Sequence, residues 1–266
     1  MKYKMVVTDL DGTLLNSNHK LSQYTIDTIR KVSEKGIKFV IATGRHYEDA
    51  KYFFNQIEVG KYLISGNGSF VHNELGEVIS RKSISKELIK KLLELEIQEG
   101  TSRSIYIGEE WYTDFMVQDY IDFHKESKFA PKVCSLDIFK NKEVEKIFFI
   151  HKDREVIEKL ERRLYELGLD KELNIATSQP TCLEVMDKSV NKGEALKTLL
   201  ECEKIVADEV IAFGDALNDK EMLELVEKGI IMGNGDKKLQ ELLPKCEVIG
   251  TSDDDSEAKY LQVFFK

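Results

Sequence analysis

The sequence predicts an α/β protein in which a parallel-sheet domain is interrupted by an inserted α+β domain. Three observations support this fold class. Short apolar runs alternate with single amphipathic helices near the N-terminus, and the same alternation returns from about Asn191. Between these stretches, strand pairs joined by turn residues are mixed with long helical patterns. Strands separated by single helices favour right-handed crossovers and a parallel sheet, whereas hairpins favour an antiparallel one.

The first stretch is predicted to contain three strands and two helices. Ser22 is expected to cap a helix whose apolar residues recur at three-residue spacing, and Lys35-Gly36 closes it. The second helix carries an apolar stripe at i, i+3, i+4 and i+7, which begins at Ala50 and ends at Ile57. The predicted strands are Lys4–Leu10, Ile37–Ala42 and Tyr62–Ser65.

The middle of the chain is predicted to form an α+β unit with an antiparallel sheet. Hairpins are expected around residues 73–76 and 108–110, where turn residues separate short apolar runs. A long helix is predicted over Ser85–Glu99, and the apolar spacing over Ile157–Leu167 predicts another. The strands predicted here are Ser69–His72, Glu77–Arg81, Ser104–Ile107, Trp111–Thr113, Glu145–His151 and Cys182–Met186.

The βα alternation then resumes. The elements predicted after the insertion are helices at Lys192–Leu200 and Met222–Val226 and strands at Val210–Phe213, Ile230–Met232 and Glu247–Ile249. We therefore expect residues 1–80 and 189–266 to build one domain, and residues 81–188 to form an insertion of ordinary domain size.

The composition disfavours two classes of partner. Acidic side chains number 48 against 39 basic ones, so the formal net charge is −9. A negative surface repels polyphosphates and anionic lipids, so neither nucleic acid nor a membrane is an expected partner. No apolar run approaches the ~20 residues of a membrane span. The four cysteines lie far apart without a CxxC pair, which is typical of reduced thiols, and we expect a cytoplasmic protein.

Polar residues gather at the carboxyl ends of the predicted parallel strands, where open α/β sheets bind ligands. The runs that reach this edge are Asp9-Leu10-Asp11-Gly12-Thr13, Thr43-Gly44-Arg45, Lys192-Gly193 and Gly214-Asp215-Ala216-Leu217-Asn218-Asp219. Clustered carboxylates at Asp9, Asp11 and Asp215 would raise one another's pKa, and a Mg²⁺ ion would remove that repulsion. Lys192 and the amides of Leu10, Thr43 and Gly44 could then hold phosphate oxygens. A carboxylate is also a competent nucleophile toward phosphorus, and the second Asp of Asp-x-Asp can act as acid and base.

These motifs, in this order, resemble those of the haloacid dehalogenase-like superfamily, specifically its Cof-type phosphatases. The run Gly229-Ile230-Ile231-Met232-Gly233-Asn234 is similar to the Gly-Val-Ala-Met-Gly-Asn that commonly follows the last motif. The resemblance covers essentially the whole chain. It implies a Rossmann-like core, Mg²⁺ as cofactor, and a large mobile cap inserted after the third core strand, which corresponds to residues 81–188.

Carried over residue by residue, the resemblance implies that Asp9 is the nucleophile and Asp11 the general acid and base. Asp9, Asp11 through its backbone carbonyl, and Asp215 would hold Mg²⁺. Asp219 would orient Lys192 or a metal-bound water. The implied phosphate-binding residues are Thr43, Gly44, Lys192 and Asn218.

Two supporting residues and one departure complete the candidate site. Two roles are predicted for Arg45: a salt bridge that stabilises its loop, or a contact with the substrate. Asn67 is either a strained turn residue or, as the resemblance implies, a hinge beneath the cap, and a role at the edge of the site is favoured. The run Asp255-Ser256-Glu257 departs from an Asp-Gly pair that is frequent in the family.

The sequence therefore predicts a Mg²⁺-dependent phosphatase that acts on a small phosphorylated metabolite through an aspartyl-phosphate. Two alternatives remain open. A phosphosugar mutase would use the same chemistry but return the phosphoryl group to a sugar. A phospho-accepting regulatory domain would also place acidic residues and Mg²⁺ at strand ends, although it would need neither the insertion nor Asp11.

Overall fold

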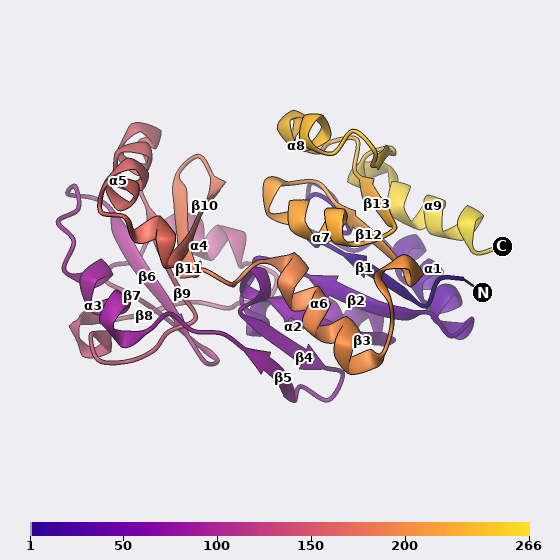
Figure 1. Ribbon diagram of the computed structural model, residues 1–266, viewed down its shortest axis with the longest axis horizontal. Helices are drawn as coiled ribbons and strands as arrows, with labels where there is room; N and C mark the ends of the chain where they lie inside the picture. Colours follow the sequence, from indigo (N-terminus) through magenta and orange to yellow (C-terminus); the bar gives the residue numbers. More distant parts are fainter. Residues whose placement is uncertain (1) are drawn as a thin grey trace. The chain divides into compact units, whose positions relative to one another are not determined.

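The computed structural model describes residues 2–266, and it divides the chain into two compact units. Unit 1 contains the chain up to Ser80 together with Asn191–Lys266, and unit 2 contains Arg81–Val190 (Figure 1). Within the described residues, no helix is long and apolar enough to cross a membrane.

Unit 1 is built on an eight-stranded sheet in the order β14-β13-β12-β1-β2-β3-β4-β5. The strands from β14 to β3 pair in parallel, and β4 pairs antiparallel to β3. The strands are β1 (Met5–Thr8), β2 (Lys38–Ala42), β3 (Gly60–Ser65), β4 (Phe70–Asn73), β5 (Val78–Arg81), β12 (Val210–Gly214), β13 (Lys228–Ile231) and β14 (Glu247–Val248). The predicted parallel sheet is thus confirmed, with every strand predicted for it present.

The hairpin around residues 73–76 has the antiparallel pairing expected of the middle stretch, but it lies within residues 1–80, the segment assigned to the first domain. Its strands β4 and β5 extend the sheet of unit 1 at one edge. The cause is a tight turn at Gly66–Gly68, in which Gly66 and Asn67 both adopt a φ of 57°. Such left-handed backbone reverses the chain within a few residues, so β4 returns alongside β3 rather than leaving the sheet.

Helices cover both faces of this sheet (Figure 1). One apolar layer contains Phe39 and Phe213 with residues of α1, α2 and α9, and the other contains Val40 and Ala212 with residues of α6, α7 and α8. The helices are α1 (Gln23–Glu34), α2 (Tyr47–Ile57), α6 (Lys192–Glu203), α7 (Lys220–Leu225), α8 (Lys237–Leu242) and α9 (Ser256–Phe264). As predicted, Ser22 caps α1, because its hydroxyl accepts from the Thr25 amide at 3.0 Å.

Unit 2 contains a six-stranded sheet in the order β10-β11-β9-β6-β7-β8, which is antiparallel except between β7 and β8. Helices α3 and α5 pack on one face through an apolar cluster that includes Ile147 and Phe149. The elements are α3 (Lys86–Leu93), β6 (Ser102–Ile107), β7 (Glu110–Thr113), α4 (Gln118–Phe123), β8 (Lys132–Val133), β9 (Lys146–Ile150), α5 (Arg154–Glu166), β10 (Leu173–Gln179) and β11 (Cys182–Asp187).

The helix predicted over Ser85–Glu99 is shorter than expected, because α3 ends at Leu93. Leu95 and Ile97 still pack against the apolar cluster of unit 2, but from irregular backbone. The chain has to turn back into β6, and it does so through Gly100 at a φ of 85°. Leu95 and Ile97, which continue the helical pattern of the sequence, therefore belong to the loop that follows α3.

Candidate active site

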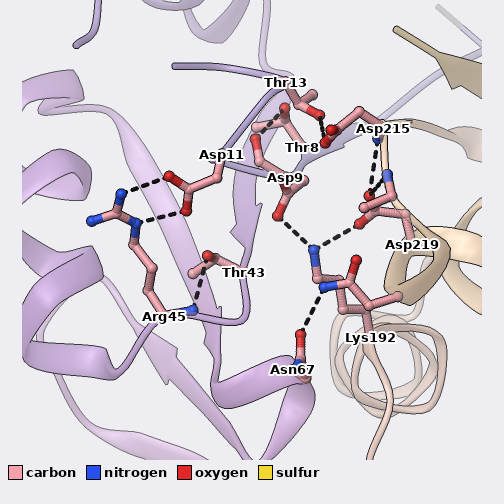
Figure 2. Close-up of polar contacts among 12 residues, drawn as sticks. Thr8, Asp9, Asp11, Thr13, Thr43, Arg45, Asn67, Lys192, Asp215 and Asp219 are labelled. Atoms are coloured by element: carbon pink, nitrogen blue, oxygen red, sulfur yellow. Dashed lines mark hydrogen bonds and ion pairs between the residues drawn. The ribbon is translucent and has the colours of Figure 1, made fainter. Parts of the chain in front are cut away.

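Three neighbouring strands of unit 1 bring the candidate residues to one edge of the sheet (Figure 2). Thr8, the last residue of β1, pairs with Ile41 on β2 and with Phe213 on β12. Since all three strands run parallel, the residues that follow them emerge at the same edge. These residues are Asp9 and Asp11 after β1, Thr43 after β2 and Asp215 after β12.

A buried ion triad joins Asp9 to α6 and to the loop after β12. Lys192 Nζ lies 2.5 Å from Asp9 Oδ1 and 2.7 Å from Asp219 Oδ1, and all three side chains are buried. Lys192 is the first residue of α6, which Asn191 caps by accepting from the Glu194 amide. Burial lowers the pKa of Lys192, but Asp219 and Asp9 outweigh this effect and raise the pKa above its usual value. These interactions favour the charged form of the Lys192 ammonium beside Asp9.

The loop after β12 carries Asp215, whose side chain is half-buried. Thr13 donates its hydroxyl to Asp215 Oδ1 at 3.0 Å, and Asp219 Oδ2 accepts from the amides of Asp215 and Ala216, each at 3.0 Å. Gly12 passes so close that a Cβ there would lie 2.3 Å from Asp215 Oδ2. A side chain at position 12 would both clash with Asp215 and be strained at a φ of 80°. Glycine therefore allows the Asp9–Thr13 loop to pass close to the Asp215 carboxylate.

The donor set fits a hard divalent cation. Carboxylate oxygens of Asp9, Asp215 and Asp219 lie within 4.8 Å of one another. Burial raises the pKa of Asp9 well above its usual value, although Lys192 opposes the shift; burial and then Asp219 raise the pKa of Asp215 to about 7. Lys192 alone therefore does not neutralise the three carboxylates of Asp9, Asp215 and Asp219. Because both oxygens of Asp219 are already hydrogen-bonded, Asp9 and Asp215 are the carboxylates that would hold Mg²⁺.

The Asp11 carboxylate lies outside this group and is held by Arg45. Arg45 Nε donates to Asp11 Oδ2 at 2.7 Å, and Nη2 donates to Oδ1 at 2.6 Å (Figure 2). Arg45 Nη1 also lies 2.9 Å from the fully buried Asp49, and His19 Nδ1 lies 3.2 Å from Asp11. Burial alone would raise the pKa of Asp11, but Arg45 and then His19 lower it far below its usual range. Of the two roles predicted for Arg45, the structure shows the salt bridge.

Replacing Arg45 by Met is expected to lower the free energy of unfolding by about 3–5 kcal/mol, because the fully buried Asp49 would lose its ion pair with Arg45. The wild-type salt bridge lowers the pKa of Asp11, so its contribution is complete above the ordinary value of 3.8 and is lost as the pH falls below it. Urea unfolding at several pH values measures the difference, which should narrow in acid. Arg45→Lys, which keeps the charge, should lose less; an unchanged stability of Arg45→Met would contradict the assignment.

The remaining candidates surround the second strand end. The Thr43 hydroxyl accepts a hydrogen bond from the backbone amide of Arg45 at 3.1 Å. Asn218 Nδ2 donates to Asn67 Oδ1 at 3.0 Å, and the same oxygen would lie 2.9 Å from a Cβ added to Gly44. Asn67 thus joins the loops that carry Gly44 and Asn218, as an edge residue would. Leu10, the residue between the two aspartates, is fully buried.

Two contacts were not anticipated from the sequence. Asp49 lies in the first turn of α2, four residues after Arg45, which precedes the helix, and this i, i+4 spacing is a signal that could have revealed the pair. Glu257 on α9 lies 2.7 Å from Thr8, the residue that precedes Asp9. No local spacing predicts that contact, because 249 residues separate the partners.

Comparison with known proteins gives consistent matches along the whole chain. Residues 6–261 match the family model for haloacid dehalogenase-like hydrolases. A Haemophilus influenzae protein named "Putative phosphatase" is 36% identical over 267 residues, covering 100% of this chain and 98% of that protein. The HMP-PP phosphatase of Yersinia enterocolitica is 33% identical over 260 residues, covering 98% of this chain and 94% of that protein. A solved haloacid dehalogenase-like hydrolase from Bacteroides thetaiotaomicron aligns with a TM-score of 0.87 at 28% identity, covering 99% of this chain and 100% of that one.

Proposed function

The chain belongs to the haloacid dehalogenase-like hydrolases, as a Cof-type phosphatase, and we propose that it hydrolyses small phosphomonoesters with Mg²⁺ through an aspartyl-phosphate on Asp9. One observation supports this proposal above the others. Asp9 stands at the end of β1, 2.5 Å from the buried Lys192 ammonium and beside Asp215. A nucleophile, a fixed positive charge and a cation-binding carboxylate therefore meet at one point.

The proposed reaction has two steps. In the first, an Asp9 oxygen bonds to phosphorus while the bond to the leaving oxygen breaks, and Asp11 gives that oxygen its proton. In the second, Asp11 takes a proton from water, which attacks phosphorus and releases Asp9 and inorganic phosphate. When bound, Mg²⁺ supplies positive charge to the phosphoryl oxygens and to the acidic pair.

Lys192 and the strand-end groups have electrostatic and positioning roles in this scheme. Lys192 neutralises charge on the phosphoryl oxygens, which Thr43, Asn218 and the amides of Leu10 and Gly44 orient. Asp219 keeps Lys192 charged and aimed at Asp9. Because Arg45 favours the ionised form of Asp11, the acid step requires the Asp11 carboxyl to leave Arg45 and take up a proton before it protonates the leaving group.

A phosphate-release screen over phosphorylated metabolites tests the proposal, with p-nitrophenyl phosphate as the general probe. We expect many turnovers per enzyme, strict dependence on added Mg²⁺ and loss of activity with EDTA. Sugar phosphates and the substrate named for the Yersinia relative belong in the panel. Isomerised phosphosugar without free phosphate would instead indicate a mutase. Stoichiometric phosphorylation without release would indicate a phospho-accepting regulatory protein.

Mg²⁺ binding is expected to weaken as the pH falls below about 7. Burial and the nearby Asp219 raise the pKa of the metal-free Asp215 to about 7, so the cation has to displace a proton at lower pH. The dissociation constant should rise by up to about tenfold per pH unit below that value. Isothermal titration calorimetry with Mg²⁺ from pH 5.5 to 8.5 measures it. A dissociation constant that stays constant over this range would show that Asp215 does not bind the ion.

A further inference from the structure

Glu257 is a buried acid that the proposed reaction does not use. It lies on α9 with 3% of its surface exposed, and its Oε2 is 2.7 Å from the hydroxyl of the fully buried Thr8. Within the described residues, its Oε1 is buried and makes no hydrogen bond. The same Thr8 hydroxyl lies 3.0 Å from the backbone carbonyl of Asp9. Glu257 is therefore two hydrogen bonds from the backbone carbonyl of Asp9, on the side of the sheet that α9 covers.

The hydrogen bonds identify the form of this acid. A buried carboxylate with one neutral partner and one bare oxygen is strongly disfavoured. The Thr8 hydroxyl lies within hydrogen-bond distance of two oxygens, the Asp9 carbonyl and Glu257 Oε2, but it has only one proton and can donate to only one of them. If Thr8 donated to Glu257, the acid proton would sit on Oε1, where it has no acceptor. Every proton finds an acceptor only if Glu257 donates to Thr8 and Thr8 donates to Asp9.

We infer that Glu257 is a positioning residue for the phosphatase reaction, acting through Thr8 on the peptide that joins Asp9 to Leu10. This inference rests on the proposed function, because that peptide carries both the nucleophile and the Leu10 amide assigned to the phosphoryl group. A hydrogen bond to a carbonyl fixes its peptide plane and polarises the amide on the other side of the same peptide. The chain of donors therefore runs from α9 to the phosphate-binding edge without crossing solvent.

The pKa of Glu257 agrees with this arrangement. Burial raises it from the ordinary 4.5 to about 8, against a smaller lowering by Thr8. Asp9, which follows β1, is not among the causes of the shift, and neither are Asp255 and Tyr260, which lie close to Glu257 in the sequence. The folded protein therefore keeps a proton that the unfolded chain loses above pH 4.5. Stability attributable to Glu257 falls as the pH rises from 4.5 to about 8.

Three variants separate a donor from a space-filling side chain. Glu257→Gln keeps a donor that cannot ionise, Glu257→Leu removes the donor but fills the space, and Thr8→Val removes the relay. With p-nitrophenyl phosphate and saturating Mg²⁺ at pH 7, we expect Glu257→Gln to keep kcat within about twofold and Glu257→Leu to lose about tenfold, with KM little changed. Thr8→Val combined with Glu257→Leu should lose no more than either single variant.

Two pH series supply readouts that a packing role would not alter. Wild-type kcat should decline above about pH 8, where Glu257 ionises, and that decline should be absent in Glu257→Gln. The wild-type Tm should also fall relative to that of Glu257→Gln between pH 5 and 8. An active Glu257→Leu variant with wild-type kcat, or equal losses in Gln and Leu, would overturn the inference alone. Wild-type protein that releases no phosphate from any probe would overturn the proposed function, and the inference with it.

Discussion

Asp9→Asn is expected to lower kcat for phosphate release by at least about 1,000-fold while leaving the fold intact. An amide oxygen is a far weaker nucleophile than a carboxylate, so the first bond to phosphorus would not form. The side chain keeps its size, and its oxygen can still accept from Lys192, which lies 2.5 Å from Asp9 Oδ1. Steady-state assays with p-nitrophenyl phosphate and Mg²⁺ measure the loss, and circular dichroism with thermal unfolding checks the fold.

The matched control for this variant is Asp49→Asn. Asp49 is another buried aspartate in an ion pair, but it contacts Arg45 rather than Lys192 and lies outside the group of carboxylates around Asp9. We expect that variant to lose stability while retaining most of its turnover. Mg²⁺-dependent hydrolysis by Asp9→Asn at more than a few per cent of the wild-type rate would remove Asp9 from the role of nucleophile.

Lys192→Met is expected to lower the free energy of unfolding by about 3–5 kcal/mol and to abolish turnover. The side chain is fully buried between Asp9 and Asp219, so its removal leaves two acidic groups buried without a cation. The neutral variant also has no charge to offer the phosphoryl oxygens. Urea unfolding measures the stability, and the phosphate-release assay measures turnover.

Two further variants isolate the charge from the packing. Lys197→Met alters an exposed lysine of the same helix, so its stability should remain within about 0.5 kcal/mol of wild type. Combining Lys192→Met with Asp219→Asn removes one of the unpaired carboxylates, so we expect the double variant to be more stable than Lys192→Met alone. A Lys192→Met protein as stable as wild type would contradict the buried triad.

The parts of the fold that follow from local pattern were predictable from the sequence. The Ser22 cap and the apolar stripe of α2 report backbone preferences that act within a few residues. The placement of Asp9, Thr43 and Asp215 at one edge also follows, because parallel strands end on the same side. Local pattern does not say which sheet a hairpin joins, and β4 and β5 extend the first sheet rather than the inserted one.

Side-chain partners were less predictable than strand ends. Asp11 was expected to stand near the phosphoryl group, but in the described structure Arg45 holds its carboxylate through two hydrogen bonds. The choice between these positions depends on competing electrostatic interactions rather than on spacing. Glu257 and Thr8 meet across 249 residues, and only the packing of α9 against the sheet brings them together. Contacts of this kind depend on the complete fold.

The net charge of −9 predicts the properties of the protein surface but not those of the candidate site. It describes the average surface of the chain, which remains a poor match for an extended polyanion. The candidate site has a different balance, since a fully buried lysine and a cation held by Asp9 and Asp215 would meet a single phosphoryl group there. A compact anion can therefore be the substrate of an acidic protein.

Trapping the covalent intermediate tests the central claim, that Asp9 carries the phosphoryl group. Enzyme with Mg²⁺ and p-nitrophenyl phosphate is quenched in acid and treated with borohydride, which reduces an acyl phosphate to the alcohol. Peptide mass spectrometry then locates the change. The account predicts homoserine in place of Asp9, only when substrate and Mg²⁺ are both present. Reduction at another carboxylate, or rapid phosphate release with Asp9 unmodified at every quench time, would contradict it.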